Sequence, residues 1–279
     1  MEVSPLTIDL ARQERETEKR AVEKVRPHSL RNRRTPEIPP VRASVRSLHW
    51  WYLPWKTAID YGIALVLALL AAPVMALAAA LVKLTSRGPA FYSQTRIGRN
   101  GRLYTIYKIR TMVHDCESLT GPRWSMPDDP RVTRIGQFLR KTHLDELPQL
   151  FNVLRGDMSL IGPRPERPEF LPNLERAIPH YRGRLAVRPG ITGLAQVHLA
   201  ADTDLESVRR KLIYDFHYIR HVNPWLDLRI LIATFFYTLG DPLHLTRRIT
   251  GIPDDGDGND SVSEEVGSDS TMAGERMCA

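Results

Sequence analysis

Cysteine is scarce in this sequence. The 279 residues contain two cysteines, Cys116 and Cys278, and neither has a CxxC or CxxH neighbour. Neither a disulfide framework nor a zinc site is therefore indicated, and a reducing, cytoplasmic environment is expected. The first 50 residues also lack the apolar run of a secretory signal peptide, so export by that route is not expected.

Acidic residues are in deficit, with 32 Asp and Glu against 39 Lys and Arg and a formal net charge of +7. The first 50 residues carry a net charge of +4 and residues 253–279 carry −7, which leaves +10 on residues 51–252. The middle of the chain is thus expected to bind an anionic partner, such as nucleic acid, lipid headgroups or a phosphorylated small molecule. Charge alone does not decide among these three.

One long stretch lacks charge altogether. Between Asp60 and Lys83 lie 22 uncharged residues, which is long enough for one helix to cross the hydrocarbon core of a membrane. Ala72 and Pro73 lie in its middle, and a proline inside a helix removes one backbone hydrogen bond and clashes with the preceding turn. The sequence therefore predicts a membrane helix that is kinked at Ala72-Pro73.

The charges that flank this stretch favour a re-entrant helix. Lys and Arg prefer the cytoplasmic side of a membrane, and both flanks are basic, with Lys56 before the stretch and Lys83 and Arg87 after it. A helix that turns back, with both ends in the cytoplasm, satisfies both flanks, whereas a straight span sends one of them across. The aromatic residues just before the stretch predict an anchor at the membrane interface: Trp50, Trp51, Tyr52 and Trp55.

The remaining patterns predict a mainly α-helical fold with one small β-hairpin. Two β-prone runs meet at Asn100-Gly101, the strongest short signal for a hairpin. Apolar residues recur at helical spacing over residues 139–154. Residues 212–239, interrupted by Pro224, predict either amphipathic helices in the membrane interface or packed core helices.

Four segments follow from these patterns. Residues 1–50 are polar and Arg-rich and are predicted to be a flexible tail, and residues 51–88 hold the interfacial anchor and the membrane helix. Residues 89–250 form the predicted cytoplasmic domain. Residues 251–279 are acidic and rich in Gly, Ser and Asp, so they cannot bury enough surface to offset the entropy of ordering and are predicted to be disordered.

The stretch "THLDELPQLFNVLRGDMSLIGPRP" places two adjacent carboxylates, Asp145 and Glu146, before a proline and an apolar run. If Asp145 lies near a helix N-cap, the free N–H groups and the helix dipole keep the carboxylates ionised and favour phosphate nearby. The common alternative is that such a pair only caps the helix. Against it, Arg140 and Lys141 precede the pair, and Arg164 lies in a rigid Pro-Arg-Pro frame suited to bidentate phosphate contact. Such an arrangement suits phosphoryl transfer with a divalent metal and a carboxylate nucleophile.

Four stretches, in a fixed order, carry a family resemblance: "YSQTRIGRNGRLYTIYKIRTM", "DPRVTRIGQFLRKTHLDELPQLFNVLRGDMSLIGPRPERPEF", "LAVRPGITGLAQV" and "YDFHYIRHVNPWLDLRIL". They resemble the bacterial sugar transferase family, the monotopic phosphoglycosyl transferases that begin exopolysaccharide, O-antigen or glycoprotein glycan assembly. The resemblance runs from about residue 53 to residue 241. The membrane helix of that family is re-entrant and broken at a Ser-Pro pair, where this sequence has Ala72-Pro73.

The resemblance implies a reaction and its partners. A sugar 1-phosphate would pass from a UDP-sugar to undecaprenyl phosphate, with release of UMP, at the bacterial inner membrane and with the catalytic domain facing the cytoplasm. The implied partners are the UDP-sugar, undecaprenyl phosphate and membrane lipids, with Mg²⁺ as cofactor and without nucleic acid.

The resemblance also implies roles for individual residues. Asp145 would be the nucleophile and form a covalent phosphosugar intermediate, and Glu146 would hold Mg²⁺ together with Asp145 or orient the attack. Four residues are implied to hold the diphosphate and the uridine: Arg140, Pro163, Arg164 and Pro165. Two further residues, Lys108 and Arg110, are weaker candidates for phosphate contact.

Two rival functions stay open at this point. A membrane-bound nucleotide-sugar hydrolase would use the same carboxylates to activate water, and a non-catalytic basic scaffold would need no adjacent carboxylates. The sequence also leaves open which sugar is transferred, which polymer results and whether the chain forms a homo-oligomer. Near the carboxylates, His143 is expected to be a packed or solvated neighbour, while Asp157 and Ser159 are expected to cap the next turn.

Overall fold

The computed structural model describes residues 52–117, 121, 129–199, 204–240 and 243–251. This part of the chain is mainly helical with a small antiparallel hairpin, as the sequence predicts. The tails predicted at 1–50 and, except for Gly251, at 251–279 lie outside the described residues, as do Trp50 and Trp51 of the predicted aromatic anchor.

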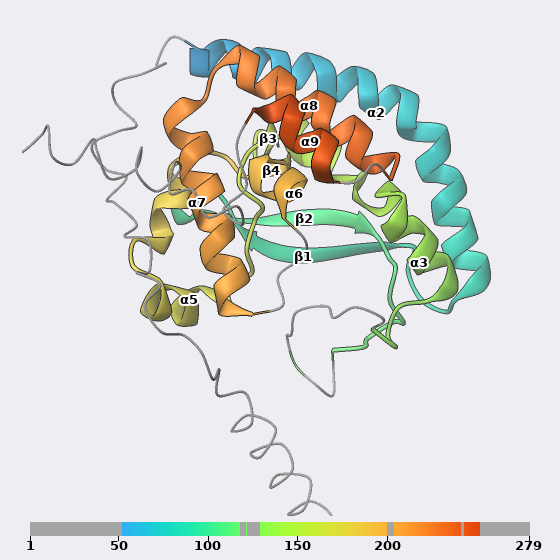
Figure 1. Ribbon diagram of the computed structural model, residues 1–279. Coiled ribbons are helices and arrows are strands. Elements are labelled where there is room, and N and C mark those ends of the chain that lie inside the picture. The colour runs from blue at the N-terminus through green and yellow to red at the C-terminus, as the bar shows by residue number, and fades with distance from the viewer. Residues whose placement is uncertain (1–51, 118–120, 122–128, 200–203, 241–242, 252–279) are drawn as a thin grey trace, which may run out of the picture. The chain divides into compact units, whose positions relative to one another are not determined.

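The uncharged stretch lies within one long helix, α2 (Tyr52–Thr85). Alanine and leucine, which have the highest helix propensities, dominate it. The helix continues through Pro73, and its ribbon bends part-way along its length (Figure 1). It is long and apolar enough to cross a membrane.

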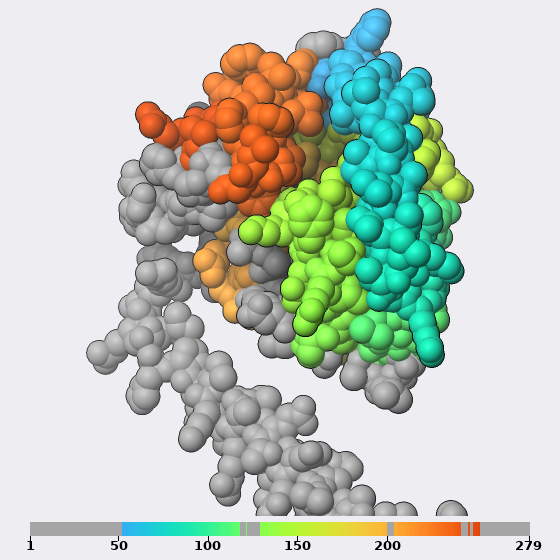
Figure 2. All heavy atoms as spheres, turned by 90° about the vertical axis from the view of Figure 1, so that its right-hand side faces the viewer, coloured from blue at the N-terminus to red at the C-terminus, as the bar shows by residue number. Residues whose placement is uncertain are grey.

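The two sides of α2 differ in residue size. The side that packs on the rest of the domain includes three alanines, and its buried apolar members are Tyr52, Ala64, Ala68, Met75, Ala78 and Val82. The opposite side is a row of large aliphatic residues, among which Leu69 and Leu70 are 68% and 69% exposed. This side forms the long ridge that faces the viewer in Figure 2.

The predicted β-hairpin is confirmed. Strand β1 (Phe91–Ile97) pairs antiparallel with β2 (Leu103–Ile109), from Phe91 opposite Ile109 to Ile97 opposite Leu103. A single 3₁₀ turn, η2 (Arg99–Gly101), joins them, and Asn100 and Gly101 both adopt positive φ, at 57° and 81°. Asn and Gly tolerate this conformation, which is why their pairing marks a tight hairpin.

A second, parallel pair of strands was not predicted. Strand β3 (Ser159–Ile161) lies beside β4 (Gly190–Thr192), with Ser159 opposite Gly190. The two segments approach so closely that a Cβ on Gly162 or on Gly190 would overlap the backbone of the other segment. Ser159 therefore begins a strand, and the prediction that it caps a turn is wrong.

The periodic segment 139–154 is not one helix. It is divided among α3 (Arg134–Lys141), the 3₁₀ turn η3 (Leu144–Glu146) and α4 (Gln149–Leu154). His143 separates the first two because its φ of 56° lies in the left-handed region, which an α-helix cannot continue through. Phe151, part of the same periodic pattern, is 48% exposed.

The C-terminal half is a set of helices that enclose the core. These are α5 (Leu171–Ala177), η4 (Tyr181–Ala186), α6 (Leu194–His198), α7 (Leu205–His221), α8 (Pro224–Thr238) and α9 (Leu243–Thr250). Asp204 starts α7 with a capping box, and Asn223 caps α8 with Pro224 at its first position. The largest buried side chains of the core include Tyr181, Tyr214, Phe216 and Ile230.

Six buried or nearly buried polar side chains tie the first half of α2 to β3, α7 and α8. We call them the α2 anchor cluster: Tyr52, Lys56, Asp60, Ser159, Tyr218 and Asp227. Asp227 accepts hydrogen bonds from Tyr52 (2.7 Å), Lys56 (2.9 Å) and Tyr218 (2.9 Å). Ser159 donates to Asp60 at 2.6 Å, and Lys56 lies 3.5 Å from the same carboxylate. Both carboxylates of this cluster therefore have at least two donors.

Candidate active site

The two adjacent carboxylates lie in η3, against the end of strand β2. Lys108 of β2 donates to Glu146 Oε1 at 2.7 Å. Arg164, in the loop after β3, donates to the same oxygen at 2.7 Å and reaches Oε2 only at 3.5 Å. The structure thus brings together four of the predicted site residues, Lys108, Asp145, Glu146 and Arg164, from three separate parts of the chain.

The two cations decide the charge of Glu146. Burial alone would raise the pKa of this carboxyl, but Arg164 and Lys108 outweigh burial and hold it well below its usual range. Burial also lowers the pKa of Lys108, and the negative charge of Glu146 opposes that shift. Glu146 is therefore an ionised carboxylate held by two cations.

Asp145 has a different environment although it is the neighbouring residue. Its side chain is buried, at 7% exposure, and makes no hydrogen bond or ion pair with any other residue that the structure describes. Burial raises the pKa of Asp145, with Glu146 adding to the shift and Lys108, Arg140 and Arg164 reducing it. A desolvated carboxylate without hydrogen-bond donors is more reactive as a nucleophile than a saturated one.

Arg140 is the third cation near Asp145. It lies in the last turn of α3, and its Nε donates to Thr111 Oγ1 at 2.9 Å. The positive charge of Arg140 acts on Asp145, whose pKa it helps to lower. The structure therefore places the charge of Arg140 near Asp145, and the contact of Arg140 with the diphosphate stays a prediction.

Arg110 has a different set of contacts. Its guanidinium donates to the backbone carbonyls of Ser86 (3.0 Å) and Arg87, and to Ser86 Oγ at 2.8 Å. These atoms lie just beyond the end of α2, where helix carbonyls lack partners within the helix. In this structure Arg110 holds the C-terminal end of α2, and the prediction that it contacts phosphate gains no support from its position.

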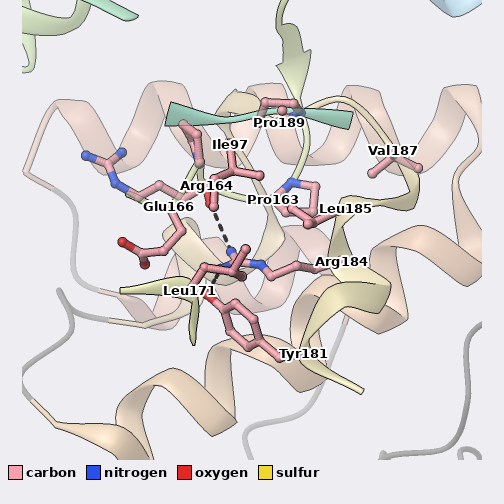
Figure 3. A pocket seen from close by; sticks show the side chains of 12 residues that line it. Ile97, Pro163, Arg164, Glu166, Leu171, Tyr181, Arg184, Leu185, Val187 and Pro189 are labelled. Atoms are coloured by element: carbon pink, nitrogen blue, oxygen red, sulfur yellow. Dashed lines mark hydrogen bonds between the residues drawn. The ribbon is translucent and has the colours of Figure 1, made fainter. Parts of the chain in front are cut away.

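The Pro163-Arg164-Pro165 turn forms one wall of a pocket (Figure 3). Ile97 and Tyr181 also line it. The turn is held through its backbone, because Arg184 donates to the carbonyl of Arg164 at 3.0 Å and Arg96 donates to that of Pro165 at 3.2 Å. The side chain of Arg164 is thus left to reach Glu146 while its main chain is fixed.

Arg184 is a buried support of this turn that the sequence did not reveal. It pairs with Asp215 at 2.7 Å and donates to the hydroxyl of Tyr181 at 2.6 Å. Asp215 holds the pKa of Arg184 above its usual value although burial opposes this. Arg184 therefore remains charged and can fix the turn.

Asn152 is a second residue that the sequence analysis missed. It is fully buried in α4, and its side-chain amide donates to the carbonyl of Thr105 at 2.7 Å and accepts from the N–H of Tyr107 at 3.2 Å. The side-chain amide of Asn152 thus pairs with the edge of β2 that does not face β1, next to Lys108. A signal was present, because asparagine is a poor helix former and stands there within an apolar run.

The two carboxylates of the site are possible ligands for a magnesium ion. No cluster of three or more His, Cys, Asp and Glu that could hold a metal is found among the described residues. Mg²⁺ commonly binds one or two carboxylates and completes its shell with substrate phosphates and water. Asp145 has no hydrogen bond to a described residue, and Glu146 Oε2 has only the 3.5 Å contact with Arg164, so both carboxylates retain oxygen atoms for such an ion.

The family model described as bacterial sugar transferase matches residues 51–241. This chain belongs to the bacterial sugar transferase family. The match contains α2, the hairpin and all of the site residues above.

Individual relatives of this chain agree with the family match. The chain is 44% identical over 179 residues to UDP-N-acetylgalactosamine-undecaprenyl-phosphate N-acetylgalactosaminephosphotransferase of Aeromonas hydrophila, covering 64% of this chain and 42% of that protein. It is 41% identical over 194 residues to undecaprenyl-phosphate glucose phosphotransferase of Komagataeibacter xylinus, covering 68% and 36%. It is 40% identical over 184 residues to exopolysaccharide production protein PSS of Rhizobium leguminosarum bv. phaseoli, covering 64% and 92%. The aligned part is thus about two fifths of the first two relatives and most of the third.

Proposed function

We propose that this protein transfers a sugar 1-phosphate from a UDP-sugar to undecaprenyl phosphate, with release of UMP, as a first membrane step in polysaccharide assembly. The observation that carries the proposal is the contrast within the carboxylate pair. Glu146 is held by Lys108 and Arg164, whereas Asp145 is buried beside the same cations without a hydrogen bond to a described residue. The names of relatives such as the Aeromonas protein support the donor and acceptor classes.

In the proposed first step, an oxygen of the Asp145 carboxylate attacks the phosphorus that bears the sugar. The new Asp145–phosphorus linkage forms as the phosphoanhydride bond breaks, and UMP leaves with the electron pair. In the second step, a phosphate oxygen of undecaprenyl phosphate attacks the same phosphorus and Asp145 is released unchanged. A carboxylate nucleophile of this kind divides one difficult transfer into two easier ones.

The neighbouring cations would make this attack possible. An anion approaching a diphosphate is repelled, and the fixed charges of Lys108, Arg140 and Arg164 offset that repulsion in a poorly solvated site. Mg²⁺ held by Asp145 and Glu146 would act as a Lewis acid on the phosphate oxygens. Arg164, which contacts Glu146 from the Pro163-Arg164-Pro165 turn, is the proposed contact for the diphosphate.

We also propose that α2 is re-entrant in the cytoplasmic membrane, with the catalytic domain on the cytoplasmic side. The first half of α2 is bound to the domain through the α2 anchor cluster. At the other end, just after the last turn, Arg110 donates a hydrogen bond to the backbone carbonyl of Ser86. Both ends of the helix therefore contact one domain, which requires both ends to lie on the same side of a bilayer. The exposed leucines between them would face lipid.

The test uses the full chain in lipid vesicles with undecaprenyl phosphate, Mg²⁺ and a panel of UDP-sugars, and follows UMP. Lipid-dependent, continuous release of UMP with at least one sugar is expected for wild type, and its loss is expected for Asp145→Asn. Glu175→Gln, on α5, changes a carboxylate that pairs with Arg182 outside the site, so it serves as a matched control and should retain wild-type rates. Continuous UMP release without lipid would indicate a hydrolase, and unchanged activity of Asp145→Asn would refute the nucleophile.

A single release of UMP, equal to the amount of enzyme, is expected when the lipid is omitted. This burst follows from the covalent intermediate, because Asp145 can react once and then waits for the acceptor. The trapped phosphosugar should add its mass to the peptide that contains Asp145.

A further inference from the structure

Thr111 lies where the end of the β-hairpin meets helix α3. It follows β2 by two residues and is 7% exposed. Its backbone carbonyl accepts hydrogen bonds from the N–H of Thr133 at 3.0 Å and from the hydroxyl of Thr133 at 3.3 Å. Thr133 is the N-cap of α3, and its hydroxyl in turn accepts from the N–H of Gly136 at 2.9 Å. The start of α3 is thus fixed on one peptide group, that of Thr111.

Gly136 lets α3 approach the backbone carbonyl of Thr111 more closely than any residue with a side chain would allow. A Cβ at position 136 would overlap the carbonyl oxygen of Thr111. Gly136 and Arg140 are four residues apart in α3, so they lie on the same face, one turn from each other. The close approach at Gly136 therefore brings the side chain of Arg140 within reach of the hydroxyl of Thr111, which accepts from Arg140 Nε at 2.9 Å.

We propose that Thr111 is a positioning residue for the transfer reaction, and that its hydroxyl fixes the guanidinium of Arg140 beside Asp145. This inference rests on the proposed function for what Arg140 contacts, namely a substrate phosphate, but the Thr111–Arg140 bond itself does not depend on it. A guanidinium held at Nε loses less side-chain freedom when it binds a phosphate than one that moves freely. Thr111 would thus act through Arg140 and would touch no substrate itself.

The residue type at position 111 allows a matched pair of variants. Thr111→Val keeps the volume and the branched shape but removes the hydroxyl, whereas Thr111→Ser keeps the hydroxyl and removes a methyl group. The backbone bonds to Thr133 are available to both. Equal thermal unfolding temperatures of the two variants would establish that differences between them do not arise from the fold.

We expect Thr111→Val to lower kcat/KM by about 10- to 100-fold, the range of a hydrogen bond to a charged group. Thr111→Ser is expected to remain within about threefold of wild type, since the bond is kept. In an Arg140→Ala background, Thr111→Val should cost little more, because the partner through which it acts is gone. If the activity of Arg140→Ala is too low to measure, the comparison of Thr111→Val with Thr111→Ser tests the role of Thr111 by itself.

Three outcomes would overturn the inference: wild-type kcat/KM in Thr111→Val, an equal loss in Thr111→Ser, or a full additional loss from Thr111→Val on top of Arg140→Ala. A readout without turnover separates this from failure of the proposed function. The Arg140 Nε–H should exchange slowly with solvent in ¹⁵N NMR of wild type and Thr111→Ser, and rapidly in Thr111→Val. Should wild type release no UMP, the proposed function fails while this signal still supports or refutes the role of Thr111.

Discussion

The α2 anchor cluster and the site on η3 are both buried groups of carboxylates and cations, and they differ in how far their hydrogen-bonding capacity is used. In the α2 anchor cluster, Asp227 has three donors at 2.7–2.9 Å and Asp60 has a hydroxyl at 2.6 Å with Lys56 at 3.5 Å. In the site on η3, Glu146 has two donors at 2.7 Å, but Asp145 has none among the described residues.

This difference separates a structural role from a chemical one. A buried carboxylate that is left without donors costs free energy, and native structures rarely keep one without a reason. In the α2 anchor cluster, hydrogen bonds from other side chains of the protein offset that free-energy cost. At Asp145 no described residue donates a hydrogen bond to offset that cost, so the carboxylate can still accept a partner such as a metal ion or the phosphorus of a substrate.

The largest effect that this contrast predicts belongs to Asp145→Asn. Transfer activity should fall by about a thousandfold or more, because the nucleophile is removed. The melting temperature should rise at neutral pH. A carboxyl whose folded-state pKa is raised destabilises the fold at pH values above that pKa, and the amide removes this penalty. Calorimetry and the UMP assay on the same sample check both parts.

A matched comparison makes this result specific. Glu146→Gln removes the neighbouring charge, but it should lower the melting temperature because Lys108 and Arg164 lose their partner. If both variants lowered stability alike, the contrast within the pair would be refuted.

A smaller effect on transfer and a large one on stability are expected from Asp227→Ala. The change leaves the ammonium of Lys56 without its nearest carboxylate and removes the Asp227 acceptor from the phenols of Tyr52 and Tyr218. Removing one partner of a buried ion pair costs about 3–5 kcal/mol, so the unfolding temperature should fall by many degrees. Activity per folded molecule should stay within about tenfold of wild type if this cluster only seats α2.

Tyr52→Phe is the graded control for this prediction, since it removes one of the three donors and should cost about 1 kcal/mol. Loss of transfer in Asp227→Ala at a temperature where the protein is fully folded would contradict the purely structural role.

The parts of the fold that could be predicted are those that depend on residues close together in sequence. Asn100-Gly101 marks its own turn, and Asp204 and Pro224 mark the starts of helices by local chemistry. The pairing of β3 with β4 could not be predicted in this way. Each strand has three residues, too few for a period, and their contact depends on the distant glycines Gly162 and Gly190.

The site shows the same division. The adjacent carboxylates, Arg140 and Arg164 are present in the sequence as a motif, but the motif does not say which carboxylate the cations hold. The sequence likewise gives Lys108 and Arg110 as equal candidates. The structure separates them, because Lys108 turns to Glu146 and Arg110 to the end of α2. Such choices depend on tertiary contacts that local patterns do not record.

The smallest predicted effect is a shift in the pH profile of kcat/KM, whose acid limb should lie at higher pH than an ordinary aspartate would give. The proposed nucleophile reacts as the carboxylate, so kcat/KM should fall as pH falls through the pKa of Asp145 in the free protein. In the protein without bound Mg²⁺, burial and Glu146 raise that pKa, and the three nearby cations only partly oppose them. At Mg²⁺ concentrations that leave the free protein unoccupied, the limb should therefore lie above the ordinary range of aspartate. Arg140→Ala should move it further up, because one of the opposing charges is removed. A limb at or below the ordinary range in wild type, or no upward movement in Arg140→Ala, would mean that a group other than Asp145 controls the reaction.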